Sequence, residues 1–485
     1  MRARIGQKVA VGTVFVAAMF MSIMDATIVN VALPTIGRDF SVTPTAVAGV
    51  SIAFLVSLAV FIPASGWLGD RFGGKRVMLV AIAVFTLASA LCGLAWSLET
   101  LVLFRILQGV GGGMLAPVGM AMLFRAFPQR ERIRAAAILT VPTTFAPALG
   151  PVVGGLLVTD LSWRWVFYVN VPIGLATLLF GLIYLDPVAE GTPGPFDLAG
   201  FLLSGVSLGL LMYGVSVGPN LGWSAPAVLG TVTAGAVLLA ATVVVELRTT
   251  APLLELRLLA NRMFRATSVV IVLSGMAFIG TLYAVSLYFQ NGRGLSALAA
   301  GLSTFPEAFG VMAGAQLASR VLYSRLGPRR HITVGLLGTS ASIGLLSLLG
   351  EHSSLWWARL LLFCIGFSMA QVFVPAQTAA FADISREATG RASTMFNTVR
   401  QLGGAIGVAL LTTAIVLIGP TRFIAGQSTA NLGAYRVAFL VAAAVCLLGV
   451  ASALYIRDAD AEATLPVRRQ PAAAEPMAPV PVATE

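Results

Sequence analysis

The sequence predicts an all-helical membrane protein, and three observations carry this prediction. First, 58% of the 485 residues are hydrophobic and only 11% are charged, whereas about 25% of residues in soluble domains are charged. Second, apolar runs of about 20 residues, the length that crosses a bilayer as a helix, recur along the whole chain. Third, short turns that carry most of the Lys and Arg residues separate these runs. The net charge of +11 is therefore dispersed, and no concentrated basic patch indicates a nucleic-acid partner.

Fourteen apolar runs are predicted to be membrane-spanning helices, and the even number places both termini on one side. The first run is too long for the apolar region of a signal peptide, so we expect it to remain as a span. The spans cover about 9–33, 47–68, 77–97, 101–124, 135–158, 165–185, 198–217, 224–246, 266–290, 297–319, 331–350, 356–380, 395–418 and 435–456.

The distribution of basic residues predicts the orientation of the chain. Loops that stay in the cytoplasm are enriched in Lys and Arg. With the amino terminus inside, the outer segments hold only six of the 31 basic residues: Arg38, Arg164, Arg293, Arg359, Arg422 and Arg436. We therefore expect a multi-pass protein of the cytoplasmic membrane with both termini in the cytoplasm and the lipid bilayer as its surroundings.

The inner turn after the second span contains a motif that occurs twice. The turn has the sequence GWLGDRFGGKR (Gly66–Arg76), and its RxGxKR part recurs as RLGPRR (Arg325–Arg330). Such parallel repeats predict two six-helix halves with a binding site between them. The predicted domains are a first bundle, a two-helix insertion with linkers, a second bundle and a disordered cytoplasmic tail, at 1–186, 187–262, 263–457 and 458–485.

Five motifs together resemble one transporter family. The GxLxDRxGxKR pattern of the inner turn resembles the signature of the major facilitator superfamily. The other motifs are MDATIVNVALP (Met24–Pro34), RILQGVGGG (Arg105–Gly113), APALGPVVGG (Ala146–Gly155) and WRWVFYVNVPIG (Trp163–Gly174). This set is similar to the fourteen-helix drug:proton antiporter branch of multidrug efflux proteins. The resemblance implies the major facilitator fold and proton-coupled export of amphipathic or cationic drugs by alternating access, with protons as the coupling ion, no other cofactor, and drug resistance as its consequence. We expect a monomer.

Two of these motifs are predicted to control gating. Glycines open a smooth face for close helix packing, and prolines remove a backbone donor and bend a helix. Asp70 is expected to form a charge-linked latch to the other half at the cytoplasmic side. A plain basic turn and ordinary small-residue packing are the alternatives that need no gating. The predicted gating residues are Gly66, Asp70, Arg71, Gly73, Lys75, Arg76, Gly150, Pro151, Gly154 and Gly155.

A proton-coupling cluster is predicted from the charged and amide groups inside the spans, where a charge is costly enough to indicate function. Counted from the outer ends of their spans, Asp25 lies about 12 Å deep, Gln108 about 10 Å and Arg105 about 6 Å. If the first and fourth spans adjoin, these side chains can meet, and Asp25 could load and release a proton. A static ion pair that orients the two helices is the alternative.

Glu307 is a second candidate for proton coupling, about 15 Å deep in its span and directly after Pro306. It is predicted to be an additional proton site or a counter-charge for a cationic substrate, and a structural carboxylic acid is equally compatible with the sequence. Arg400, in a later span, could pair with an acid or face the cytoplasmic vestibule.

Polar and soft side chains at membrane depth are candidates for substrate binding, with core packing or lipid contact as the alternative. They are Met24, Asn30, Gln108, Tyr283, Tyr288, Gln290, Met369 and Gln371. No Walker pattern, catalytic set or metal-ligand cluster is found, so we expect neither an enzyme nor a nucleotide or metal partner. The alternative functions are a dedicated exporter of one endogenous lipid, siderophore or antibiotic, and a membrane receptor or sensor on a transporter-like fold.

Overall fold

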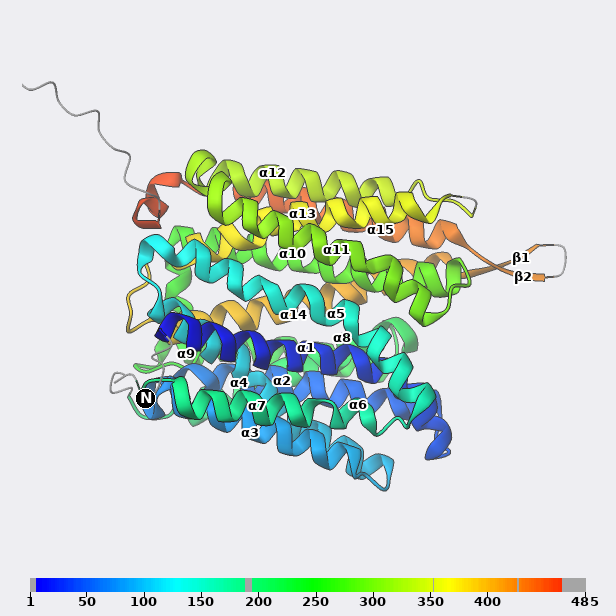
Figure 1. The fold of residues 1–485 in the computed structure, drawn as a ribbon, viewed down its shortest axis with the longest axis horizontal. Coiled ribbons are helices and arrows are strands. Elements are labelled where there is room, and N and C mark those ends of the chain that lie inside the picture. Colours follow the sequence, from blue (N-terminus) through cyan, green and yellow to red (C-terminus); the bar gives the residue numbers. More distant parts are fainter. Residues whose placement is uncertain (1–5, 188–193, 352, 425–426, 465–485) are drawn as a thin grey trace, which may run out of the picture.

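The computed structural model describes residues 6–187, 194–351, 353–424 and 427–464. In these residues the chain forms two bundles of long helices that lie side by side (Figure 1). Eleven helices of the described part are long and apolar enough to cross a membrane. Because lipid offers no hydrogen bonds to the backbone, such spans satisfy their own polar groups as helices. The prediction of an all-helical, multi-span membrane protein is confirmed.

The first bundle contains the helices before the acidic loop. They are α1 (Gln7–Asp39), α2 (Pro44–Phe72), α3 (Gly74–Gly93), α4 (Leu98–Ala126), α5 (Arg132–Asp160), α6 (Trp165–Tyr168) and α7 (Asn170–Tyr184), with a 3₁₀ turn at Gln129–Glu131. The predicted span 165–185 is divided into α6 and α7, which separate at Val169. Each of the other predicted spans in this half falls on one helix.

The insertion and the second bundle follow in chain order. They are α8 (Leu198–Leu221), α9 (Pro226–Arg248), α10 (Arg262–Leu287), α11 (Ala297–Leu317), α12 (Tyr323–Leu346), α13 (Leu355–Ala380), α14 (Thr389–Ile418) and α15 (Leu432–Ala453). Short π turns continue α10 through Tyr288–Gly292 and α11 through Ala318–Leu322, and a 3₁₀ turn lies at Leu256–Ala260. A hairpin that the sequence analysis did not predict, β1 (Thr421–Ile424) and β2 (Gln427–Ala430), joins α14 to α15 and pairs Thr421 with Ala430.

The two bundles repeat the same helix contacts. The pairs α1 with α5, α2 with α4, and α3 with α7 in the first bundle correspond to α10 with α14, α11 with α13, and α12 with α15 in the second. The bundles meet along two seams, one between α2 and α14 and the other between α5 and α11. Helix α8 packs on both α2 and α14, so the insertion covers the first seam. This arrangement is the one expected of a parallel repeat.

The repeated turn has the same backbone geometry in both halves. Gly73 has φ +86° and Gly327 has φ +71°, a region that glycine adopts without a steric penalty. In the second copy, the backbone N–H of Arg329 donates to Asp458 Oδ1 at 2.8 Å. Asp458 begins a 3₁₀ helix, Asp458–Thr464. The prediction of disorder is therefore wrong for these seven residues, and 465–485 lie outside the described part.

Glycine lets helices within each bundle touch backbone to backbone. Gly109 and Gly113 on α4 lie against carbonyl oxygens of α2, and Gly310 and Gly314 on α11 lie against carbonyl oxygens of α13. A Cβ atom at any of these positions would overlap its neighbour. The corresponding contact therefore uses glycines in both halves, although they come from different helices of the pair.

Gly407→Ala should destabilise the second bundle, because a Cβ atom there would overlap the carbonyl oxygen and Cα of Met276 on α10. Overpacking of this kind costs about 1–3 kcal/mol. Gly404→Ala is the matched control on the same helix, since its Cβ would lie 3.7 Å from the Ile279 side chain. Thermal unfolding of the purified variants checks this, and equal melting temperatures would contradict the close contact.

Candidate functional site

The first candidate site is a polar cluster buried in the first bundle. Asp25 on α1, Arg105 and Gln108 on α4, and Asn170 on α7 all have 0% exposure. The structure thus brings together the three residues that the sequence analysis expected to meet. Ser89 on α3 is equally buried and completes the cluster, which connects four helices.

Asp25 has an unusually complete set of hydrogen-bond donors. Arg105 Nη1 donates to Asp25 Oδ2, while Gln108 Nε2 and Asn170 Nδ2 donate to Asp25 Oδ1 at 2.9 and 2.8 Å. The Arg105 guanidinium also lies 4.2 Å from the centre of the Phe54 ring. Three side chains therefore donate to this carboxylate, and one of them is a charged guanidinium.

Two members of the cluster were missed by the sequence analysis. Asn170 lies within the WRWVFYVNVPIG motif, where one amide in an apolar run was a usable signal. Ser89 Oγ accepts from Gln108 at 3.2 Å and from Asn170 at 3.1 Å, and donates to Phe167 O. Serine is common in membrane helices, so Ser89 gave no such signal.

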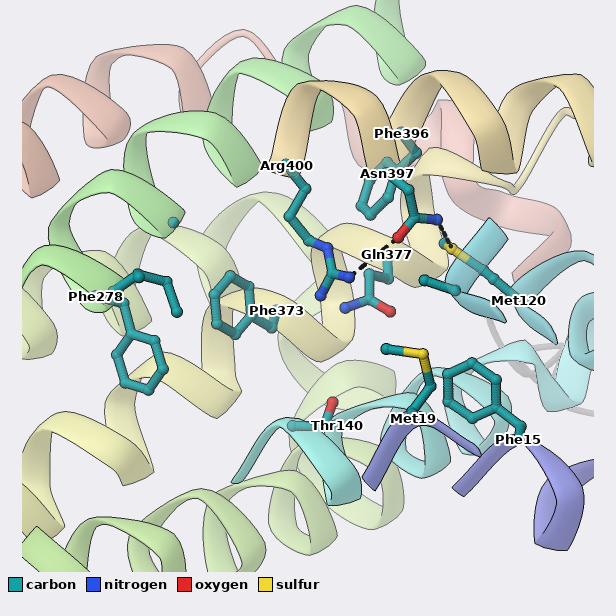
Figure 2. Close-up of a pocket in the computed structure, with 13 residues that line it drawn as sticks. Phe15, Met19, Met120, Thr140, Phe278, Phe373, Gln377, Phe396, Asn397 and Arg400 are labelled. Atoms are coloured by element: carbon teal, nitrogen blue, oxygen red, sulfur yellow. Dashed lines mark hydrogen bonds between the residues drawn. The ribbon is translucent and has the colours of Figure 1, made fainter. Parts of the chain in front are cut away.

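The second candidate site is a cavity of about 80 Å³ between the bundles (Figure 2). Helices α1, α4 and α5 of the first bundle and α10, α13 and α14 of the second contribute to it. Its volume is far below the ~300–1,000 Å³ of ligand pockets, so the bundles are nearly closed around it. The lining residues are Phe15, Met19, Ala116, Met120, Thr140, Gly275, Phe278, Ile279, Phe373, Gln377, Phe396, Asn397 and Arg400.

Most polar groups in this cavity come from α13 and α14, and Thr140 is contributed by α5. Arg400 Nη2 donates to Asn397 Oδ1 at 3.1 Å, and Asn397 Nδ2 reaches Met120 Sδ of the other bundle at 3.2 Å. The sequence left two roles open for Arg400, pairing with an acid or facing the cytoplasmic vestibule. In the structure Arg400 faces a space between the bundles. Among the described residues no acid forms an ion pair with it. The sequence analysis did not assign this residue to substrate binding.

The residues predicted to bind substrate lie elsewhere, and none of them lines this cavity. Met24 and Met369 are buried in the cores of their bundles, and Gln108 belongs to the Asp25 cluster. Gln371 donates to Gly314 O at 3.0 Å and pairs with His331. The remaining four predicted residues are either packed at the end of α10, as Tyr288 is, or exposed, as are Asn30, Tyr283 and Gln290. The prediction did not include the residues that line this cavity, because uniformly apolar helices do not reveal which face points inward, and substrate binding by the predicted residues stays a prediction.

Glu307 does not line the cavity either. Its side chain is only 7% exposed, and among the described residues no hydrogen bond or ion pair to it is found. Its backbone oxygen lies against Gly366 of α13. The structure therefore places a buried acid on α11 at a position whose backbone faces α13 and which does not line the described cavity, and its predicted roles stay untested.

Among the described residues no charged group of the other half forms an ion pair with Asp70, so the predicted latch needs a correction. Asp70 Oδ1 accepts from Arg125 Nη2 at 2.8 Å within the first bundle. Arg125 Nε then donates to Arg386 O at 3.3 Å, and Arg386 Nη2 donates to Arg125 O at 3.1 Å. Asp70 thus orients the arginine that makes the contact across the seam.

Further contacts close the same end of the molecule, the end at which α1 begins (Figure 1). Phe124 and Phe381 stack with ring centres 4.6 Å apart, and Arg132 donates to Phe381 O. Ser65 and Thr394 are joined by a hydrogen bond of 3.2 Å. Gly66 is next to them, where a Cβ would lie 2.6 Å from Thr394 Oγ1. The bundles are therefore in contact across this end.

The other predicted gating residues have different surroundings. Lys75 donates to the last carbonyls of α7, including Leu182 O at 3.3 Å, whereas Arg71 and Arg76 are exposed. Gly150 and Gly154 pack on Thr27 and Ile28 of α1, and Gly155 has open space around it. Pro151 belongs to α5, and its side chain lies outside the described part. Gly150 and Gly154 thus lie at the packing contact between α5 and α1.

Arg105→Gln should destabilise the protein by about 3–5 kcal/mol, because it leaves the Asp25 carboxylate buried without a counter-charge. The double variant Asp25→Asn/Arg105→Gln should recover most of this loss, since neither remaining group is charged. Thermal unfolding of the purified proteins measures both effects. Arg164→Gln is the control, because its ion pair with Asp39 is half exposed and should contribute at most about 1 kcal/mol. A double variant as unstable as the single one would show that charge is not what holds the cluster.

Asp70→Asn and Arg125→Gln should have the same effect, namely to loosen the contact with Arg386 and open this end. The measurement is the rate at which a membrane-impermeant thiol reagent modifies Gln377→Cys in inside-out vesicles, with the three native cysteines replaced. We expect a several-fold increase for both variants and none for Arg130→Gln, an exposed arginine of the neighbouring turn. A faster modification rate in Arg125→Gln alone would show that Asp70 does not support the contact with Arg386.

Comparison with known proteins agrees with this architecture. The family model described as Major Facilitator Superfamily matches residues 15–408. The chain is 31% identical to the tetracenomycin C resistance and export protein of Streptomyces glaucescens, over 94% of this chain and 92% of that protein. It is 32% identical to the putative multidrug resistance protein MdtD of Serratia proteamaculans, over 82% and 83% of the two chains. The human organic anion transporter MFSD10 (TETRAN) shares the fold at 17% identity, with a TM-score of 0.65 over 92% of this chain and 99% of that one. The chain belongs to the major facilitator superfamily.

Proposed function

We propose that this protein exports amphipathic small molecules in exchange for protons. The observation that carries the proposal is the cavity between the two bundles, which is lined by aromatic rings, methionines and a few polar groups from both halves. Such a lining accepts varied apolar bodies and holds few groups that impose one shape. Relatives named for export and for multidrug resistance support the outward direction of transport. Members of this superfamily are transporters, and no catalytic activity is indicated.

We propose alternating access because the cavity lies between the two bundles. The contacts of Arg125, Phe381 and Thr394 close one end, so substrate would reach the cavity from that end only after the bundles rotate apart. We assign this end to the cytoplasm because of the distribution of basic residues. The structure in hand then corresponds to a state that is closed toward the cytoplasm.

Proton coupling is proposed to occur at the Asp25 cluster. Helices α1 and α4 carry both this cluster and part of the cavity wall, and Asp25 is six residues, or about 9 Å along the helix, from Met19. Protonation of Asp25 would remove the charge that holds Arg105, and the release would let α1 and α4 shift relative to each other. The occupancy of the cavity and the protonation of Asp25 would thus act on the same two helices.

The membrane topology is part of the proposal. Helices α5, α11 and α12 are not counted in the eleven candidate spans, but they have 29, 21 and 24 residues and pack against helices that are, so we infer that they also cross the bilayer. The result is fourteen spans in a six, two and six arrangement. We propose a monomer in the cytoplasmic membrane, with both termini in the cytoplasm.

Expression in a host that lacks its own efflux pumps should lower the accumulation of the neutral dye Nile red at least several-fold, and an uncoupler should abolish the difference. In proteoliposomes, addition of the dye should release protons in the direction opposite to the dye. The double variant Asp25→Asn/Arg105→Gln should fold and lose uphill export, whereas Arg38→Gln, an exposed outer residue, should retain it.

Uphill export by the double variant under an imposed pH gradient would exclude Asp25 as the coupling group. Dye binding without any proton flux in the wild-type protein would instead favour a receptor or sensor.

A further inference from the structure

The cavity between the bundles carries an uncompensated positive charge. Arg400 lies on α14, and among the described residues only Asn397 Oδ1 accepts a hydrogen bond from its guanidinium. Asn397 is three residues earlier on the same helix, so this bond fixes the direction of the arginine without neutralising it. None of the described lining residues is acidic. A guanidinium at membrane depth is costly unless a counter-charge or water reaches it.

A second polar group in the cavity has no partner. Gln377 on α13 is only 7% exposed and lines the same space, and among the described residues its amide makes no hydrogen bond. Figure 2 shows the Arg400 and Gln377 side chains extending into the space between the bundles. Buried amides are ordinarily hydrogen-bonded, so an amide without a described partner, in the same cavity as a guanidinium that makes one described hydrogen bond, indicates a ligand that accepts hydrogen bonds.

The rest of the wall defines the body of that ligand. Phe278 and Phe373 lie on the same side of the cavity as Arg400, and Phe15, Met19 and Met120 belong to the opposite bundle. Aromatic rings and thioethers favour a flat apolar ring system. A guanidinium presents several N–H donors in one plane, which match the oxygens of a carboxylate, phenolate or sulfonate.

We propose that the preferred substrates are organic anions with an apolar ring body, bound through Arg400 with Gln377 as a second donor. The proposal rests on the proposed export function, because it names the substrate class of the same cavity. It replaces the expectation of cationic substrates, which the family resemblance implied and for which Glu307 was a candidate counter-charge. A cation in the cavity would meet a positive charge and no described carboxylate.

The test compares three probes that share one ring system and differ in charge: 2-naphthalenesulfonate, 2-naphthalenesulfonamide and 2-naphthyltrimethylammonium. Their dissociation constants are measured on the purified full-length protein in detergent by equilibrium dialysis, with protein-free micelles as the blank. The wild-type protein should bind the sulfonate most tightly. Arg400→Gln should weaken sulfonate binding at least about tenfold, as expected for a hydrogen bond to a charged group, and change sulfonamide binding less than about twofold.

Matched variants separate charge from folding. Arg400→Lys keeps the charge and should keep the preference for the sulfonate, and Arg38→Gln should bind as the wild type does. Equal weakening of all probes in Arg400→Gln, a wild-type preference for the cation, or failure of the wild type to bind the sulfonate would each overturn the proposal. Because binding is measured without a proton gradient, sulfonate binding by a protein that fails to export would uphold the substrate class and reject proton-driven export.

Discussion

The first bundle depends on an ion pair that the membrane interior makes costly to break. The Asp25 carboxylate and the Arg105 guanidinium are both removed from water, and their mutual attraction offsets the loss of hydration only while the geometry is kept. The donors that complete this geometry come from α4 and α7, and Ser89 of α3 holds those donors in place. Four helices are thereby fixed relative to one another around one charge. Hydrophobic burial cannot provide this specificity, because lipid is as apolar as the helix surfaces.

Much of the fold was predictable because the signals are local. Span lengths follow from bilayer thickness, and the repeated turn needs glycine at a positive φ angle, so Gly73 and Gly327 mark equivalent places in the two halves. The contact of Asp25 with Arg105 was predictable because few charged groups lie at membrane depth, so that shared depth indicated the pair. The hairpin before α15 was not predictable in this way, because its short strands lie outside the apolar runs.

The cavity could not be predicted, since its lining depends on the rotation of each helix about its axis. A helix that is apolar on all sides has no polar face to mark its orientation. Arg400 was noticed only as a charge within a span, and Gln377 was not singled out at all. The partner of Asp70 was misassigned for a related reason: the sequence shows that Asp70 has a charge but not that its ion-pair partner is Arg125 of the same bundle.

The glycine contacts inside the bundles also determine where the molecule can deform. At Gly109, Gly113, Gly310 and Gly314 two backbones touch, and a backbone has no alternative rotamers with which to preserve contact during sliding. Such helix pairs must separate over their whole contact at once, which makes each bundle stiff. Across the seams the contacts are made largely by side chains, which can change rotamers one at a time. Mechanical compliance is therefore concentrated between the bundles, and thermal energy drives relative rotation of two stiff bodies more readily than distortion within either one.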